Sequence, residues 1–135
     1  MAKKANQKKK LLLLMRYFQE ETDREHPTTI VKLINMLEQE EISAERKSLY
    51  DDIAILREWG MPIENRGGQY YLRENTFTLP ELKLLTDAVA SSRFISESRS
   101  RVLIRKIAGL TNRFARMQLQ RQVYLTGRSK TTNEA

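Results

Sequence analysis

The 135-residue sequence has no cysteine, a single histidine and no long apolar run. Without cysteine, neither a disulfide framework nor a cysteine-ligated zinc site can form. The lack of cysteine also fits the cytoplasm, where we expect the chain to act. No apolar segment approaches the roughly 20 residues that a membrane span requires, so we expect no membrane partner. The sequence offers no phosphate-binding glycine loop and no cluster of metal ligands, so we expect neither an enzyme nor a cofactor.

Charge is the first positive signal. There are 24 lysine and arginine residues against 17 acidic residues, which gives a formal net charge of +7. Five lysines lie in the first ten residues, and the C-terminal stretch contains Arg113, Arg116, Arg121, Arg128 and Lys130. A basic excess favours a polyanionic partner, although the basic ends of a chain are often only solvated. The charge therefore supports nucleic-acid binding without establishing it.

In the first half of the chain, apolar residues recur at helical spacing in three stretches, which predicts three helices. These helices cover residues 10–21, 28–40 and 43–59. Pro27 separates the first helix from the second, because proline disfavours helix in the residue before it. Thr28 or Thr29 can cap the second helix, and Ser43 can cap the third. Gly60 ends the third helix at a position where a left-handed conformation costs little.

After Gly60 the pattern changes to short extended segments. Residues 61–66 and 69–73 flank Gly67-Gly68, whose positive backbone angles suit a tight turn, and this predicts a β-hairpin. Three helices followed by a hairpin over residues 8–75 are typical of a winged helix-turn-helix DNA-binding domain. In that arrangement the third helix enters the major groove of DNA and the hairpin is the wing beside it.

Residues 77–128 are predicted to form a second, helical unit that serves as a linker or for dimerisation. Thr78 and Ser96 can cap its first two helices. The expected apolar faces are Leu82, Leu85, Ala88 and Val89 in one helix, and Val102, Leu103, Ile107 and Leu110 in the next. Residues 113–120 are predicted to be helical, 122–126 extended, and 1–7 and 129–135 flexible ends. The predicted fold class is mainly α with a small β-hairpin.

The outer face of the third predicted helix carries the candidate DNA-reading residues. With Leu49 at the centre of the buried face, Lys47 lies on the opposite side, between Arg46 and Tyr50 on one flank and Ser48 on the other. Arginine and lysine can donate hydrogen bonds to guanine acceptors. Outside this helix, threonine hydroxyls at the second helix start and an arginine at the hairpin tip suit phosphate contacts. The candidate DNA-binding residues are Thr28, Thr29, Ser43, Arg46, Lys47, Ser48, Tyr50 and Arg66.

The same residues have a structural interpretation. The third helix is not net basic, and surface helices commonly carry mixed charges as i, i+4 pairs. Asp51 is repelled by phosphate, so it either accepts a hydrogen bond from cytosine or pairs with Lys47. The alternative function is therefore a winged-helix module that packs on another protein and binds no DNA.

Several motifs of the sequence carry a likeness to a known family. They are Ser43-Ala-Glu-Arg-Lys-Ser-Leu-Tyr-Asp-Asp-Ile53, Leu56, Gly60, Pro62-Ile63, Gly68-Gln-Tyr-Tyr-Leu72, Phe77-Thr-Leu-Pro-Glu-Leu-Lys-Leu-Leu-Thr-Asp-Ala-Val89, Ser92-Arg-Phe-Ile-Ser96, Lys106-Ile107 and Leu119-Gln-Arg-Gln-Val-Tyr124. In these motifs the sequence resembles the DeoR-like winged-helix domains that open bacterial WYL-domain transcriptional regulators. The resemblance implies sequence-specific binding of double-stranded DNA by a homodimeric regulator of transcription. Family members often carry a base where Asp51 stands, which puts that contact in question.

In that family the segment that resembles Lys130 to Glu134 leads on to a WYL domain, thought to sense a ligand. This sequence contains no Trp-Tyr-Leu triplet and ends at Ala135. We therefore expect a truncated chain or a naturally shortened paralogue. A small-molecule or nucleic-acid effector is expected only for the missing WYL domain.

Overall fold

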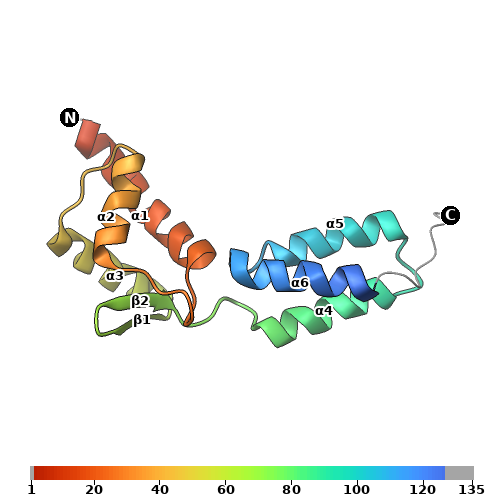
Figure 1. Ribbon diagram of the computed structural model, residues 1–135. Helices are drawn as coiled ribbons and strands as arrows, with labels where there is room; N and C mark the ends of the chain where they lie inside the picture. The colour runs from red at the N-terminus through yellow and green to blue at the C-terminus, as the bar shows by residue number, and fades with distance from the viewer. Residues whose placement is uncertain (1, 127–135) are drawn as a thin grey trace. The chain divides into compact units, whose positions relative to one another are not determined.

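The computed structural model describes the backbone of residues 2–126 and the side chains of residues 6–121. The described residues form six helices and one two-stranded antiparallel hairpin, so the fold is mainly helical with a small β-hairpin (Figure 1). Backbone contacts divide the chain into two compact units, Met1–Glu74 (unit 1) and Asn75–Ala135 (unit 2). The expected flexible end at residues 129–135 lies outside the described residues.

Unit 1 has the element order of a winged helix-turn-helix. In chain order its elements are α1 (Ala2–Glu21), α2 (Ile30–Gln39), α3 (Arg46–Trp59), β1 (Ile63–Arg66) and β2 (Gln69–Leu72). Helix α1 begins well before the predicted start at Lys10. Residues 2–7, expected to belong to a flexible end, are therefore helical.

The three helices of unit 1 enclose one apolar core. Its fully buried side chains include Leu14 and Phe18 of α1, Leu33 and Leu37 of α2, and Leu49, Ile53 and Leu56 of α3. The predicted apolar faces of the second and third helices are thus confirmed, except that Ile34 is only partly buried. Each fully buried leucine or phenylalanine contributes roughly 1.5–3 kcal/mol relative to an exposed one. This core fixes which side of α3 points outward.

The hairpin turns at two glycines, as predicted. Gly67 has φ 59° and Gly68 has φ 88°, both in the left-handed region, which suits a two-residue turn between antiparallel strands. Thr28 pairs with the hairpin as a single-residue bridge. The Thr28 N–H donates to the Tyr70 carbonyl oxygen at 2.7 Å, and the Tyr70 N–H donates to the Thr28 carbonyl oxygen at 2.8 Å. These bonds join the start of α2 to the hairpin.

The connection between α2 and α3 shows why the third helix begins later than predicted. Glu41 takes a left-handed conformation (φ 62°), and the Ile42 N–H donates to the Leu37 carbonyl oxygen at 2.8 Å. This is a Schellman ending for α2, with a glutamate at the position that usually holds glycine. The chain then needs a short extended stretch to reach the start of α3. The predicted Ser43 cap is therefore wrong: Glu45 precedes α3 and makes no side-chain cap.

Unit 2 consists of α4 (Leu79–Ser91), α5 (Glu97–Ala108) and α6 (Arg113–Thr126). The predicted caps are confirmed: Thr78 forms a capping box with Glu81, and Ser96 Oγ accepts from the Arg99 N–H. Residues 122–126, predicted to be extended, are helical. Continuing the helix pairs their backbone groups with the preceding turn, whereas an isolated extended segment would leave those groups unpaired.

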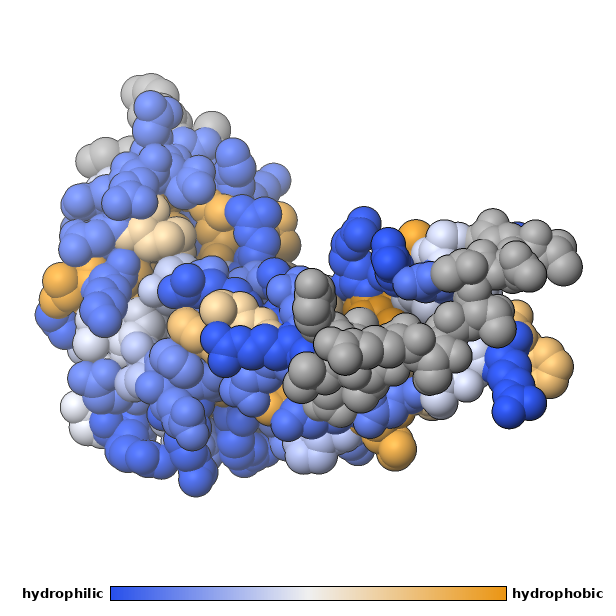
Figure 2. Space-filling model, turned by 45° about the vertical axis from the view of Figure 1, so that its right-hand side comes forward, coloured by the Kyte–Doolittle hydropathy of each residue, from blue (hydrophilic) through white to orange (hydrophobic). Residues whose placement is uncertain are grey.

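The buried faces of α4 and α5 differ from the predicted ones. Small side chains line much of the contact; the buried residues are Leu82, Thr86 and Ala90 in α4, and Ser100, Ile104 and Ala108 in α5. Small residues allow helices to approach more closely than leucine and valine do. Val102, Leu103 and Leu110 of the predicted face are instead exposed, and so is Leu85. Figure 2 shows such exposed apolar side chains as separate orange areas among hydrophilic residues.

Candidate nucleic-acid interface

The outer face of α3 carries exposed side chains. Arg46, Lys47 and Asp51 are exposed, and Tyr50 keeps 44% of its surface accessible. Within the part of the chain that the structure describes, no hydrogen bond or ion pair engages these four side chains. The Lys47–Asp51 pair considered from the sequence is thus not formed. Two cations and a phenol therefore project from one helix face with their donors available.

One flank of α3 faces the hairpin. Arg57 Nε donates to the Ile63 carbonyl oxygen at 2.8 Å and so ties the end of α3 to β1. Tyr50 lies seven residues before Arg57, which places the two side chains only about 20° apart around the helix. Arg46, eleven residues before Arg57, lies at a similar angle. These two candidate residues therefore lie on the hairpin side of the outer face.

The opposite flank of α3 is held by a lysine from α1. Lys10 Nζ lies 2.7 Å from Asp52 Oδ2, and the two side chains are only 4% and 19% exposed. The same ammonium donates to Ser48 Oγ at 2.9 Å. The ion pair spans α1 and α3, so it fixes how the outer face of α3 is presented. Sequence reasoning missed Lys10, although its spacing from Leu14 and Phe18 places it on the apolar side of α1.

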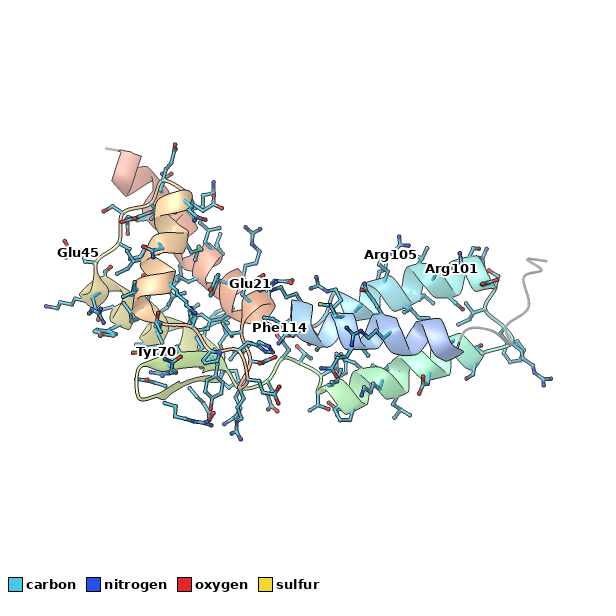
Figure 3. All side chains as sticks on the ribbon, in the orientation of Figure 1. Glu21, Glu45, Tyr70, Arg101, Arg105 and Phe114 are labelled. Atoms are coloured by element: carbon cyan, nitrogen blue, oxygen red, sulfur yellow. The ribbon has the colours of Figure 1, made fainter. Side chains whose placement is uncertain are left out.

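Two candidate residues make hydrogen bonds within unit 1. Ser48 Oγ accepts from Lys10 and donates to the Glu45 carbonyl oxygen at 2.9 Å, so it faces α1. Thr28 is 1% exposed, and its hydroxyl lies 3.3 Å from that of Tyr17. Internal hydrogen bonds thus engage both side chains, and their contacts with DNA stay a prediction. In Figure 3, Glu45 marks the start of α3 and Tyr70 marks the strand that pairs with Thr28.

The start of α2 offers a smaller set of donors. Thr29 is the N-cap: its Oγ1 accepts from the Lys32 N–H at 3.2 Å. The Thr29 hydroxyl accepts in this capping bond and can still donate its own proton. The exposed ammonium of Lys32 lies in the same first turn. Free amides and a nearby cation at a helix start suit a phosphate. Lys32 was missed from the sequence; its place three residues after the cap was the available signal.

The hairpin holds its charged residues in a small network. Tyr71 Oη donates to Glu64 Oε1 at 2.6 Å, and Arg66 donates to the same hydroxyl at 3.1 Å. The Tyr71 hydrogen bond lowers the pKa of Glu64 below its usual value, and the nearby arginines, including Arg73, lower it further. Arg66 also lies over the Tyr71 ring, 5.6 Å from its centroid. Arg66 remains exposed, but its position is fixed on the hairpin.

Asn65 in the hairpin turn and Ser43 before α3 also form hydrogen bonds within unit 1. Asn65 Oδ1 accepts from the Gly68 N–H at 2.8 Å, so this side chain stabilises the turn. Ser43 is exposed in the extended segment before α3, and its carbonyl oxygen accepts from Gln7 at 3.5 Å. Of the eight candidates, only Thr28 is buried. Thr29 and Ser48 are partly exposed, and the exposed ones are Ser43, Arg46, Lys47, Tyr50 and Arg66.

No group of three acidic or histidine side chains suited to a metal ion occurs among the described residues. None of the helices in the same part of the chain has the length and apolar content to cross a membrane. Comparison of the chain with protein-family models, with curated proteins and with solved structures gave no match.

Proposed function

We propose that this chain binds double-stranded DNA in a sequence-specific way and regulates bacterial transcription. The observation that carries the proposal is the outer face of α3, where the side chains of Arg46, Lys47 and Tyr50 are exposed beside a hairpin and make no hydrogen bond or ion pair with the described residues. A helix anchored on its inner side and free on its outer side suits the major groove, where base edges present acceptors to arginine and lysine.

Five of the accessible candidates have distinct roles in the proposed complex. Lys47, near the centre of the outer face, donates to base edges, and Arg46 reaches either a base or the adjacent phosphate. The hydroxyl of Tyr50 donates to a phosphate on the hairpin side. Arg66 contacts the backbone or the minor groove from the wing. Thr29 marks the helix start whose amides meet a phosphate.

A second copy of the chain is the proposed partner, bound through unit 2. Leu82, Ile104 and Leu119 are buried large apolar residues of this unit. A larger set is at least 40% exposed: Leu84, Phe94, Val102, Leu103, Leu110 and Met117. Covering Leu84, Phe94, Leu110 and Met117 with a second copy removes apolar area from water, and dimers of helix-turn-helix proteins bind two half-sites about one DNA turn apart. Light scattering tests this: a strict monomer at high protein concentration would contradict it.

The experiment that tests DNA binding is selection from a random duplex library at several salt concentrations. The parent chain is expected to enrich one sequence and to lose affinity steeply as salt rises. Lys8→Ala serves as the matched control for Lys47→Ala, since both remove one exposed lysine. Only the Lys47 variant should lose base preference. Failure of the parent to bind any duplex at low salt would refute the proposal.

A protein-interaction module is the second candidate, and a specific observation favours it. Ile55 and Trp59 lie one turn apart on α3 and are 49% and 80% exposed. An exposed isoleucine and tryptophan on one helix side suit a protein surface. If this function holds, the parent chain binds no duplex. The double substitution Ile55→Ser/Trp59→Ser then changes the self-association of the chain, measured by light scattering.

A further inference from the structure

The net positive charge of the chain belongs to one unit. Residues 1–74 contain 13 basic and 13 acidic side chains, so unit 1 is formally neutral. Residues 75–135 contain 11 basic and four acidic side chains, and therefore carry the whole charge of +7. Attraction to the DNA backbone depends on the number of phosphates that a protein neutralises. Unit 1, which holds the candidate reading helix, adds no net positive charge to that attraction.

Helix α5 concentrates this charge. Its 12 residues include four bases, Arg99, Arg101, Arg105 and Lys106, and a single acid, Glu97. Figure 3 shows Arg101 and Arg105 one after the other along the outer edge of the helix. Arg101 pairs with Glu97 at 2.8 Å. The other three are exposed, and in the described part of the chain none of their side chains has a hydrogen bond or ion pair.

Arg99 and Lys106 share one side of α5, about 20° apart around the helix, and Arg105 lies about 100° from Lys106. Ile104 marks the buried side of the helix, and the three side chains point at least about 100° away from it. Arg99 and Lys106 are seven residues apart, which is about 10 Å along the helix axis. Arg116 of α6 is less suitable, because its guanidinium donates to the carbonyl oxygens of Ala108 and Thr111.

We propose that α5 binds the phosphate backbone of duplex DNA through Arg99, Arg105 and Lys106. Unit 2 then supplies the sequence-independent part of the affinity, while α3 of unit 1 reads the bases. This inference rests on the proposed function, since it assumes that duplex DNA is the ligand. It divides the two tasks between the two units: affinity for any sequence from unit 2, and choice among sequences from unit 1.

The test uses the full chain and the triple substitution Arg99→Gln/Arg105→Gln/Lys106→Gln. The matched control, Lys8→Gln/Lys9→Gln/Arg16→Gln, removes the same charge from exposed positions on α1. Binding to a selected duplex and to a random duplex is measured from low to moderate salt. The slope of log affinity against log salt is expected to fall by about 2–3 in the α5 variant and by less than 1 in the control, because each phosphate contact contributes about 0.9.

The α5 variant is also expected to lose the same factor of affinity for both duplexes, which leaves the preference between them unchanged. A slope equal to that of the control would overturn the inference, as would a loss confined to the selected duplex. Failure of the proposed function looks different: the parent then shows no preference between the duplexes. Light scattering must give equal masses for parent and variant, and a fall in slope that accompanies dissociation also overturns the assignment. If the triple variant does not fold, Arg105→Gln alone should lower the slope by about 0.9.

Discussion

Lys10 gives the sharpest test of how α3 is held. The substitution Lys10→Met keeps most of the aliphatic volume and removes the ammonium that lies 2.7 Å from Asp52 Oδ2. Removing one partner of a buried ion pair typically destabilises a protein by roughly 3–5 kcal/mol, because the other charge stays buried and unpaired. Asp52 retains 19% of its surface, so water offsets part of this loss. We expect a loss of about 2–3 kcal/mol in the free energy of unfolding.

The measurement is urea denaturation followed by circular dichroism, with the double substitution Lys10→Met/Asp52→Leu as the comparison. The double variant removes both charges and fills the space with apolar atoms, so it should regain most of the lost stability. Asp52→Leu alone leaves the lysine unpaired and should be destabilised like Lys10→Met. The reasoning is refuted if Lys10→Met lies within about 0.5 kcal/mol of the parent. It is equally refuted if the losses of the two single variants simply add in the double variant.

Four further predictions concern backbone conformation, DNA contact and pH. Gly60→Ala should destabilise by about 1–2 kcal/mol in the same assay, since φ is 122° and no neighbouring atom crowds the site. Glu41→Asn should stabilise by a few tenths of a kcal/mol, because asparagine tolerates the left-handed conformation better; a loss would contradict this. Lys47→Ala should weaken binding to the preferred duplex by roughly 1–3 kcal/mol and relax base preference, whereas a uniform loss would make it a phosphate contact. The lowered pKa of Glu64, due chiefly to Tyr71, adds stability above the ordinary carboxyl pKa of about 4.3 and loses it as pH falls through the lower folded value. Glu64→Gln should therefore flatten the fall in melting temperature below about pH 4.5, and an unchanged profile would contradict the assignment.

The parts of unit 1 that follow from local patterns were predictable. Leu49, Ile53 and Leu56 recur at helical spacing, which predicts α3. Gly67 and Gly68 readily take the positive φ angles of a tight turn, which predicts the hairpin. The start of α3 did not follow, because the left-handed ending of α2 uses a glutamate. Glu41 carries no sequence signal for that conformation, and the extended stretch after it depends on how far apart the two helices pack.

Unit 2 was harder to predict because its helices pack through small residues. Periodicity picks the large apolar side chains, and in α5 these define a face centred near Leu103. The observed contact instead follows Ser100, Ile104 and Ala108, whose value lies in close approach. At the candidate interface, the outward direction of Lys47 was predictable from the helical period of 100° per residue. The internal bonds of Ser48 and Thr28 were not predictable, because their partners, Lys10 and Tyr70, lie 38 and 42 residues away in the chain.

The pairing of Thr28 with Tyr70 has a mechanical consequence. Two short hydrogen bonds join the segment before α2 to β2. Two residues further along β2, the Leu72 N–H donates to Thr22 Oγ1 at 3.0 Å. Hydrogen bonds thus connect the hairpin to both ends of the α1–α2 loop. We therefore expect the hairpin and the first turn of α2 to move together, and to bind or release a ligand together. Slow hydrogen exchange at the amides of Thr28, Tyr70 and Leu72, with matched rates, is the signature of such a coupled lever.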